Sequence, residues 1–206
     1  MTARLIVLAS GNGSNLQAIL DACADGRIDA LVVTVVSDKP DAPALSRARQ
    51  AGVEALAMPK DRYETRTEYD ARLGTAVFGR QPHWVVLAGW MRVLSMAFLS
   101  QFPGRVVNLH PALPGEFPGV DAVERAFRSG KSHTGVMVHL VPDEGVDTGP
   151  VLATVIVRIE PGESFEALMD RVHAAEHRLL VATLADLCSK PTPVDQPPTD
   201  LERTHA

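Results

Sequence analysis

The sequence predicts an α/β fold, a doubly wound and mostly parallel sheet with helices on both faces. Short β-branched runs alternate with segments of helical period from the first residues onward, which is typical of parallel strands joined by covering helices. The chain has 206 residues and is 46% hydrophobic, which is enough for one full core. We therefore expect a single domain over residues 1–188. The polar remainder, 189–206, is rich in proline and is expected to be disordered.

The first two thirds of the chain supply five strands and four helices. The apolar and β-branched runs predict strands at 5–9, 30–36, 53–58, 84–88 and 105–109. The periodic segments between them predict helices from residue 14 onward and at 43–50, 64–78 and 120–128. Ser14 with Gln17 fits a capping box, so the first helix is expected to have its cap at Ser14.

The pattern changes toward the C-terminal end. Two runs at 136–141 and 151–159, joined by a turn-rich loop, predict one antiparallel strand pair. The longest helical signal, 163–187, follows and contains Glu176 within its apolar stripe. Because a buried carboxylate is costly unless it is paired, Glu176 either meets a cation or a bound amine, or lies at a solvated rim. The pattern leaves both open.

Composition excludes several classes. The net charge is −5 without a basic cluster, so neither nucleic acid nor a membrane surface is an expected partner. The apolar run at the start is too short for a signal peptide or a membrane span. Cys23 and Cys188 have no Cys-x-x-Cys spacing and read as packed thiols of a reducing compartment. We expect a cytoplasmic protein, and no spacing predicts a metal site.

The run 105–110 acquires polar residues where the strand ends. Asn108 and His110 lie on the same face of that strand, and Pro111 stops it. An amide and an imidazole placed together suit the stabilisation of an oxyanion and the transfer of a proton. Asp147 follows a second strand-like run, where it would orient the imidazole and raise its pKa. The alternative is a strand end whose polar side chains only face water.

The turn Ser10–Asn15 (SGNGSN) lies between a strand and a helix start, where a phosphate is the natural ligand. It has two of the three glycines of a dinucleotide fingerprint, and Asp38 ends the second strand as a ribose-binding acid would. Leu16 occupies the third glycine position, which favours a monophosphate. A plain tight turn is the alternative. Residues 89–94 could line a pocket for a flat heterocycle or form a core edge.

Five motifs, in this order, resemble the phosphoribosylglycinamide formyltransferase family over residues 4–187. They are Ser10–Asn15, Ala88–Leu94 (AGWMRVL), Asn108–Pro111 (NLHP), Phe117–Gly119 (FPG) and Asp143–Pro150 (DEGVDTGP). The resemblance implies a doubly wound formyltransferase domain that uses 10-formyltetrahydrofolate as co-substrate and no metal. It implies direct transfer of the formyl group to the amine of glycinamide ribonucleotide in purine biosynthesis. The implied partners are these two small molecules, and the implied state is a monomer or homodimer.

The resemblance also implies roles for individual residues. The implied catalytic residues are Asn108, His110 and Asp147. The implied ribonucleotide site consists of Gly13, Ser14, Asn15, His173, Ala174, Ala175 and Glu176. The implied folate site consists of Arg66, Met91, Arg92, Val93, Leu94, Asn108, Asp143, Glu144, Gly145, Val146 and Asp147. The chain departs from the family at Ala112–Glu116 (ALPGE), where Ser/Ala-Leu-Leu-Pro-Lys/Ala is usual, and at 133–137, where apolar residues replace a common hydroxyl.

Three rival functions make different demands on the sequence. Formyltetrahydrofolate deformylase, a related hydrolase, carries an additional amino-terminal regulatory domain, for which a first strand near residue 4 leaves no room. An NAD-dependent oxidoreductase would need the glycine that Leu16 displaces. Methionyl-tRNA formyltransferase would need a further RNA-binding domain and a basic surface. The transferase acting on the ribonucleotide is therefore the expected function.

Overall fold

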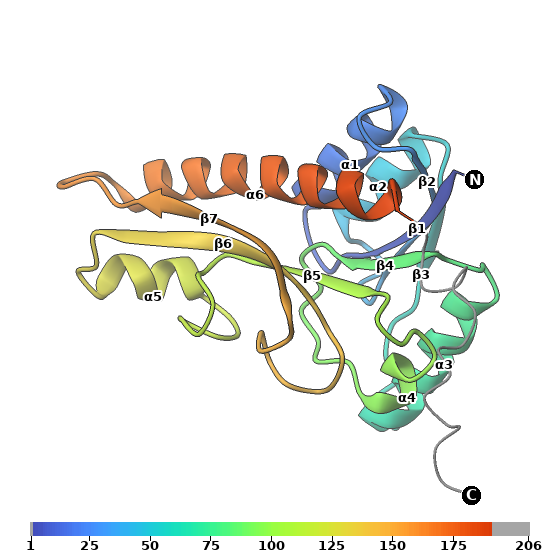
Figure 1. Cartoon of the computed structure of the whole chain (residues 1–206). Helices are drawn as coiled ribbons and strands as arrows, with labels where there is room; N and C mark the ends of the chain where they lie inside the picture. Colours follow the sequence, from blue (N-terminus) through green and yellow to red (C-terminus); the bar gives the residue numbers. More distant parts are fainter. Residues whose placement is uncertain (1, 191–206) are drawn as a thin grey trace, which may run out of the picture.

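The computed structural model describes residues 2–190, so most of the disordered tail expected at 189–206 lies outside the described residues (Figure 1). Seven strands form one sheet. The strands are β1 (Ala3–Leu8), β2 (Ala30–Ser37), β3 (Glu54–Ala57), β4 (Trp84–Leu87), β5 (Val106–His110), β6 (His133–Leu140) and β7 (Val151–Arg158). The helices are α1 (Ser14–Ala24), α2 (Pro43–Gln50), α3 (Arg66–Phe78), α4 (Met96–Leu99), α5 (Ala122–Arg128) and α6 (Phe165–Cys188).

The strand order is β3-β2-β1-β4-β5-β6-β7, with β1 to β5 parallel to one another. The predicted fold class is confirmed. The antiparallel part is larger than one pair, because β6 runs antiparallel to both β5 and β7. This pairing places His139 of β6 directly opposite Asn108 of β5, which the sequence pattern alone did not indicate.

Two hydrophobic clusters cover the two faces of the sheet. Leu5 and Val7 of β1 point to one cluster, which includes residues of α1, α2 and α6. Ile6 and Leu8 point to the other, which is formed with α3 and α4. The alternation follows from the period of two along a strand. Figure 1 shows α6 running along β6 and β7, against which it packs. Because both clusters share one sheet, we propose that residues 1–188 are a single domain.

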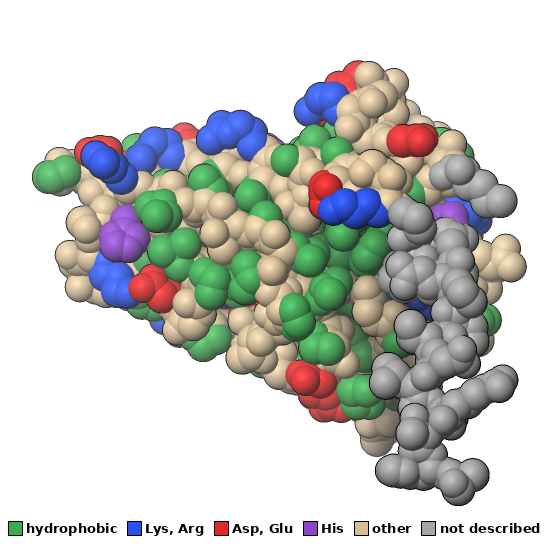
Figure 2. Space-filling view, in the orientation of Figure 1, with side chains coloured by type: hydrophobic (Ala, Val, Ile, Leu, Met, Phe, Trp, Pro, Cys, Tyr) green, Lys and Arg blue, Asp and Glu red, His purple; other side chains and the backbone are tan. Residues whose placement is uncertain are grey.

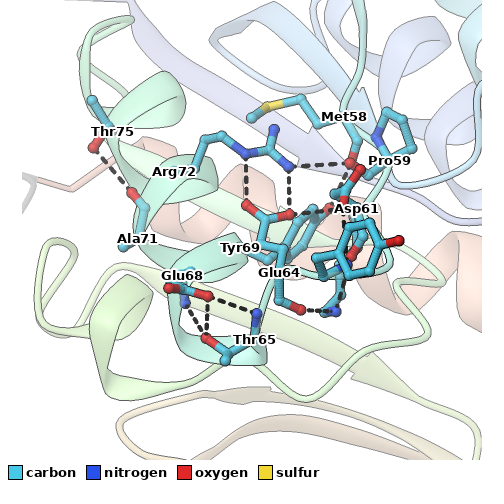
Figure 3. Close-up of polar contacts among 12 residues, drawn as sticks. Met58, Pro59, Asp61, Glu64, Thr65, Glu68, Tyr69, Ala71, Arg72 and Thr75 are labelled. Carbon is cyan, nitrogen blue, oxygen red and sulfur yellow. Dashed lines mark hydrogen bonds and ion pairs between the residues drawn. The ribbon is translucent and has the colours of Figure 1, made fainter.

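The cap of α1 differs from the sequence prediction. The expected cap at Ser14 is wrong: α1 begins at Ser14 and its cap is Gly13, which has a left-handed backbone (φ 77°) and no capping side chain. Gln17 instead donates to Asp21 at 2.8 Å. A capping box occurs at α3, where the Thr65 hydroxyl accepts from the Glu68 N–H and the Glu68 carboxylate accepts from the Thr65 N–H (Figure 3).

Candidate active site

Asn108, His110 and Asp147 form one hydrogen-bonded group at the carboxyl end of β5. The Asn108 amide nitrogen donates to Asp147 Oδ1 at 3.1 Å, and His110 Nδ1 lies 3.2 Å from Asp147 Oδ2. The Gly119 N–H donates to the same Oδ2 at 2.8 Å. Asp147 has a left-handed backbone (φ 55°), which is uncommon for a residue other than glycine. The loop after β6 is therefore bent so that it turns this carboxylate back toward β5.

His110 has an acceptor oxygen at each ring nitrogen. Nδ1 faces Asp147, and Nε2 lies 3.1 Å from the Phe117 carbonyl oxygen. Only a doubly protonated ring would satisfy both contacts. Burial nevertheless lowers the pKa of His110, and the Asp147 charge and the Phe117 carbonyl offset only part of that effect. The expected rise in the pKa of His110 is thus wrong in its net direction, although the contribution of Asp147 has the expected sign.

Asp147 remains the charged member of the group. Burial raises its pKa, but the contacts with His139 and His110 and the hydrogen bond from the Gly119 N–H together outweigh burial and leave the pKa below its ordinary value. A carboxylate that accepts several hydrogen bonds is held in its ionised form. Asp147 is therefore suited to orienting a partner ring.

His139, on the neighbouring strand β6, is a fourth member of this group. Its side chain is buried, its Nδ1 lies 2.8 Å from the Leu140 carbonyl, and its Nε2 lies 3.1 Å from the Asn108 amide nitrogen. A neutral ring with its proton on Nδ1 donates to Leu140 and accepts from Asn108. Both N–H bonds of the Asn108 amide then have partners, one on His139 and one on Asp147.

The loop 112–119, which departs from the family pattern, is tied down from α5 and β6. Arg125 donates to the Phe117 carbonyl at 2.7 Å, and Lys131 pairs with Glu116 at 2.5 Å. Leu113 packs on Gly135, where a Cβ would lie 2.4 Å from the Leu113 side chain. Leu113 therefore occupies the room left by Gly135, so the loop packs directly on β6.

The Ser10–Asn15 loop and α6 meet through Asn15 and Glu176. Asn15 Nδ2 donates to Glu176 Oε2 at 3.3 Å, and Glu176 is only 7% exposed. Burial raises the pKa of Glu176 to about 7, and the Asn15 hydrogen bond opposes only part of the rise. This geometry decides between the open readings: Glu176 is buried, and its partner in the described residues is an amide rather than a cation.

The remaining residues expected to bind the ribonucleotide lie in two places, the turn of α6 before Glu176 and the start of α1. His173 is half-buried, Ala174 is exposed and Ala175 is buried. Ser14 begins α1 and Gly13 caps it, so Gly13, Ser14 and Asn15 present the amino end of a helix. Such an end favours an anion through its dipole and its free N–H groups.

The residues expected on the folate side flank the same edge of the sheet. The segment Met91–Leu94 follows β4 and is joined to the first loop, because the Met91 N–H donates to the Ser10 hydroxyl at 3.0 Å. Met91 is 63% exposed and Val146, in the loop after β6, is 41% exposed, whereas Leu94 is buried. Figure 2 shows hydrophobic side chains across the middle of the face that it draws. The exposed side chains of Met91 and Val146 thus offer apolar surface to a ligand.

Two ion pairs fix the segments that carry these apolar side chains. Arg66, in the first turn of α3, pairs with Glu144, and Glu144 also accepts from the Met96 N–H at 3.0 Å. Within the same loop, the Asp143 carboxylate accepts from the Gly145 N–H at 2.8 Å.

The second ion pair joins Arg92 to Asp38 at 3.9 Å. The guanidinium carbon of Arg92 also lies 4.8 Å from the centre of the Tyr69 ring, over its face. Asp38, considered above as a ribose-binding acid, therefore has Arg92 as a neighbour.

Some residues with a clear part in the geometry carried no signal in the sequence. Arg125 belongs to an ordinary amphipathic helix, and its contact with Phe117 is visible only in three dimensions. Arg47 of α2 reaches the first loop across 35 positions of the chain.

In the described range 2–190, no group of histidine, cysteine and acidic residues could hold a metal ion. No helix within the same range is long and apolar enough to cross a membrane.

Comparisons with known proteins agree with this geometry. A family model described as formyl transferase matches residues 3–184. The phosphoribosylglycinamide formyltransferase of Escherichia coli (strain K12) is 41% identical over 185 residues, which cover 88% of this chain and 87% of that protein. The trifunctional purine biosynthetic protein adenosine-3 of Drosophila melanogaster is 41% identical over 186 residues, which cover 89% of this chain but only 14% of that protein.

A solved structure is similar over the same region. The crystal structure of glycinamide ribonucleotide transformylase 1 from Symbiobacterium toebii superposes with a TM-score of 0.88 at 41% identity, covering 91% of this chain and 88% of that chain. The likeness therefore extends over the whole sheet and its helices.

Proposed function

Because this chain belongs to the phosphoribosylglycinamide formyltransferases of the formyl transferase family, we propose that it transfers the formyl group of 10-formyltetrahydrofolate directly to the amine of 5'-phosphoribosylglycinamide. The products are the formylated ribonucleotide and tetrahydrofolate, in de novo purine biosynthesis. One observation carries the proposal for the site: Asn108, His110 and Asp147 come from two distant segments and meet in one hydrogen-bonded group at the carboxyl end of β5.

The proposed chemistry begins at His110 Nε2. Nδ1 is held by Asp147, so Nε2 is the nitrogen available to the formyl oxygen, and it must exchange the Phe117 carbonyl for that oxygen. Asn108 likewise exchanges one of its two N–H partners and donates to the same oxygen. A protonated His110 Nε2 and the Asn108 N–H, both aimed at the developing negative charge, stabilise the adduct that forms when the acceptor amine attacks the formyl carbon.

Asp147 supports the proton transfer. The attacking amine gives up one proton, and the departing folate nitrogen takes one up, so the two steps balance. A carboxylate with a lowered pKa keeps the His110 ring oriented and relays the proton through water to the leaving nitrogen. No covalent intermediate on the protein is required, because the acceptor amine attacks the formyl carbon directly.

The acceptor is proposed to bind between the first loop and α6. Its phosphate would accept from the N–H groups of Gly13, Ser14 and Asn15 at the amino end of α1. Glu176, with His173, Ala174 and Ala175 in the preceding turn, would meet the rest of the ribonucleotide. The Asn15–Glu176 hydrogen bond supports this placement, because it joins the two walls of the proposed site.

The folate co-substrate is proposed to bind along Met91–Leu94 and the loop Asp143–Asp147, with Arg66 and Asn108 at its ends. The exposed apolar side chains of Met91 and Val146 fit a flat heterocycle. Arg66 would give up part of its pairing with Glu144 to meet an acidic group of the ligand. We propose small molecules as the only partners, a monomer or homodimer, and a cytoplasmic location, in keeping with the free thiols at Cys23 and Cys188.

The experiment follows the absorbance of tetrahydrofolate formation with and without glycinamide ribonucleotide. We expect product only when the ribonucleotide is present. The substitution Glu176→Gln should raise the KM for the ribonucleotide while leaving the KM for formyl-folate nearly unchanged. Equal consumption of formyl-folate without the ribonucleotide would support a deformylase and overturn the proposal.

A further inference from the structure

We propose that Arg47 is a positioning residue that holds the Ser10–Asn15 loop in its anion-binding shape and thereby sets the affinity for the phosphate end of the acceptor. The inference rests on the proposed function, since that function places the phosphate on this loop. Arg47 lies on α2, outside every segment assigned above to the ribonucleotide, the folate or the chemistry.

The guanidinium group of Arg47 donates to three acceptors, two on Asn12 of the loop and one on Gln17 in the first turn of α1. Arg47 Nε donates to the Asn12 carbonyl at 2.9 Å, and its NH2 nitrogen donates to the Asn12 side-chain oxygen at 2.9 Å. Its NH1 nitrogen donates to Gln17 Oε1 at 3.2 Å. The rigid fork of arginine can satisfy several acceptors at fixed relative positions, which a lysine ammonium cannot reproduce.

The backbone of the loop lies directly on the same helix. The Ala44 N–H donates to the Gly11 carbonyl at 3.2 Å. Gly13 has a φ of +77°, and a Cβ at this position would lie 2.8 Å from the Ala44 Cβ. Ala44 and Arg47 are three positions apart and so share one face of α2. That face therefore holds the loop at Gly11, Asn12 and Gly13, immediately before the N–H groups proposed to bind phosphate.

The charge of Arg47 also acts on this part of the surface. A surface hollow is lined by Ser14, Gln17, Ala18, Asp21, Arg27, Arg47, His177, Arg178 and Val181. Arg27 is paired with Asp25 beyond the carboxyl end of α1, which leaves Arg47 and Arg178 with the single carboxylate of Asp21, so an anion is favoured in this hollow. A substrate phosphate bound at the Ser14 N–H would thus be favoured both by the shape of the loop and by the nearby positive charge. Arg47 differs from Arg27 and Arg178 in being the one that the described structure bonds to the loop itself.

The test compares Arg47→Met, Arg47→Lys and the control Arg49→Met. Methionine keeps an apolar stem without the charge, and lysine keeps the charge without the fork. Arg49 lies on the same helix and is exposed, with no side-chain hydrogen bond to any residue in the range 2–190. The measurements are KM for glycinamide ribonucleotide, KM for formyl-folate, kcat and the melting temperature.

We expect Arg47→Met to raise the KM for the ribonucleotide about tenfold or more, which is the size expected for loss of charge-assisted hydrogen bonds. Arg47→Lys should recover only part of that loss, because the fork is missing. kcat and the KM for formyl-folate should stay within about twofold of wild type, and Arg49→Met should match wild type. A role only in folding would instead lower the melting temperature with no selective change in the KM for the ribonucleotide.

An unchanged KM for the ribonucleotide in Arg47→Met, or a fall in kcat alone, would overturn the inference. If Arg47→Met is unfolded at the assay temperature, Arg47→Lys decides in the same way. Calorimetric titration with ribose 5-phosphate separates this inference from the proposed function. Absence of ribonucleotide-dependent turnover in wild type would overturn the proposed function. Equal affinity of wild type and Arg47→Met for ribose 5-phosphate would overturn the role of Arg47 alone.

Discussion

Replacement of Glu176 by glutamine should make the protein more stable at neutral and alkaline pH. Glu176 is 7% exposed, and in the described residues its side chain has one hydrogen-bond partner, the Asn15 amide at 3.3 Å. Burial raises the pKa of this carboxyl from 4.5 to about 7. The charged form is therefore unfavourable in the folded protein, and glutamine resembles the neutral form in shape.

The magnitude follows from proton linkage. In the unfolded chain the carboxyl loses its proton near pH 4.5, whereas in the folded protein it keeps the proton until about pH 7. Between these values the folded state binds more protons, so the free energy of unfolding falls as the pH rises. The full penalty, about 3 kcal/mol from the cited shift, is present above the folded pKa and absent below the unfolded one.

Urea unfolding of wild type and Glu176→Gln from about pH 4.5 to about pH 8 measures this effect. The difference in free energy of unfolding, variant minus wild type, should rise by about 3 kcal/mol across that range. Glu166→Gln is the control, because Glu166 lies on the same helix and is exposed. Its difference from wild type should not follow the same rise. Parallel pH profiles for wild type and Glu176→Gln would refute the reasoning that burial without a cation raises this pKa.

Three further outcomes follow from the site and its loops. Asp147→Asn should lower kcat by roughly 10²-fold or more and lower the pKa of His110 further in an NMR titration, because the charge that opposes burial is removed; wild-type kcat would contradict this. Arg125→Met should speed amide hydrogen exchange around Phe117, whose carbonyl Arg125 now binds at 2.7 Å, and unchanged exchange would show that other contacts hold the loop. Gly149→Ala should lower the melting temperature, because a Cβ there would lie 1.9 Å from the Leu140 carbonyl oxygen; an unchanged melting temperature would mean that the loop yields freely.

The sequence was sufficient for the strands and the long helices because their patterns are local. The apolar and β-branched runs placed all seven strands, and the period of helical segments placed every helix except the short α4. A helix of four residues, Met96–Leu99, is too short to show a period. The cap of α1 was mispredicted for a related reason: Gly13 adopts a left-handed backbone where the loop rests on Ala44, and this contact is distant in sequence.

The candidate site was only partly visible in the sequence, because its members act through distances and burial. The strand pattern put Asn108 and His110 on one face, but it could not show that His139 lies opposite Asn108 and takes one of its N–H bonds. The contact of His110 with the Phe117 carbonyl depends on the course of a loop that has no periodic pattern. Such a loop is fixed by Arg125 of α5 and by Lys131, which lies between α5 and β6.

The pKa of His110 shows why the protonation state of a side chain cannot be predicted from its charged partner alone. A neighbouring carboxylate predicts a raised pKa, and Asp147 does act in that direction. The ring is nevertheless enclosed at the end of β5, and loss of solvent outweighs the charge, so a neutral ring is favoured in this conformation. Movement of the Phe117 carbonyl away from Nε2 would remove one acceptor and admit a substrate oxygen in its place. The proton held by His110 is therefore coupled to the position of the 112–119 loop, in which this chain departs from its family.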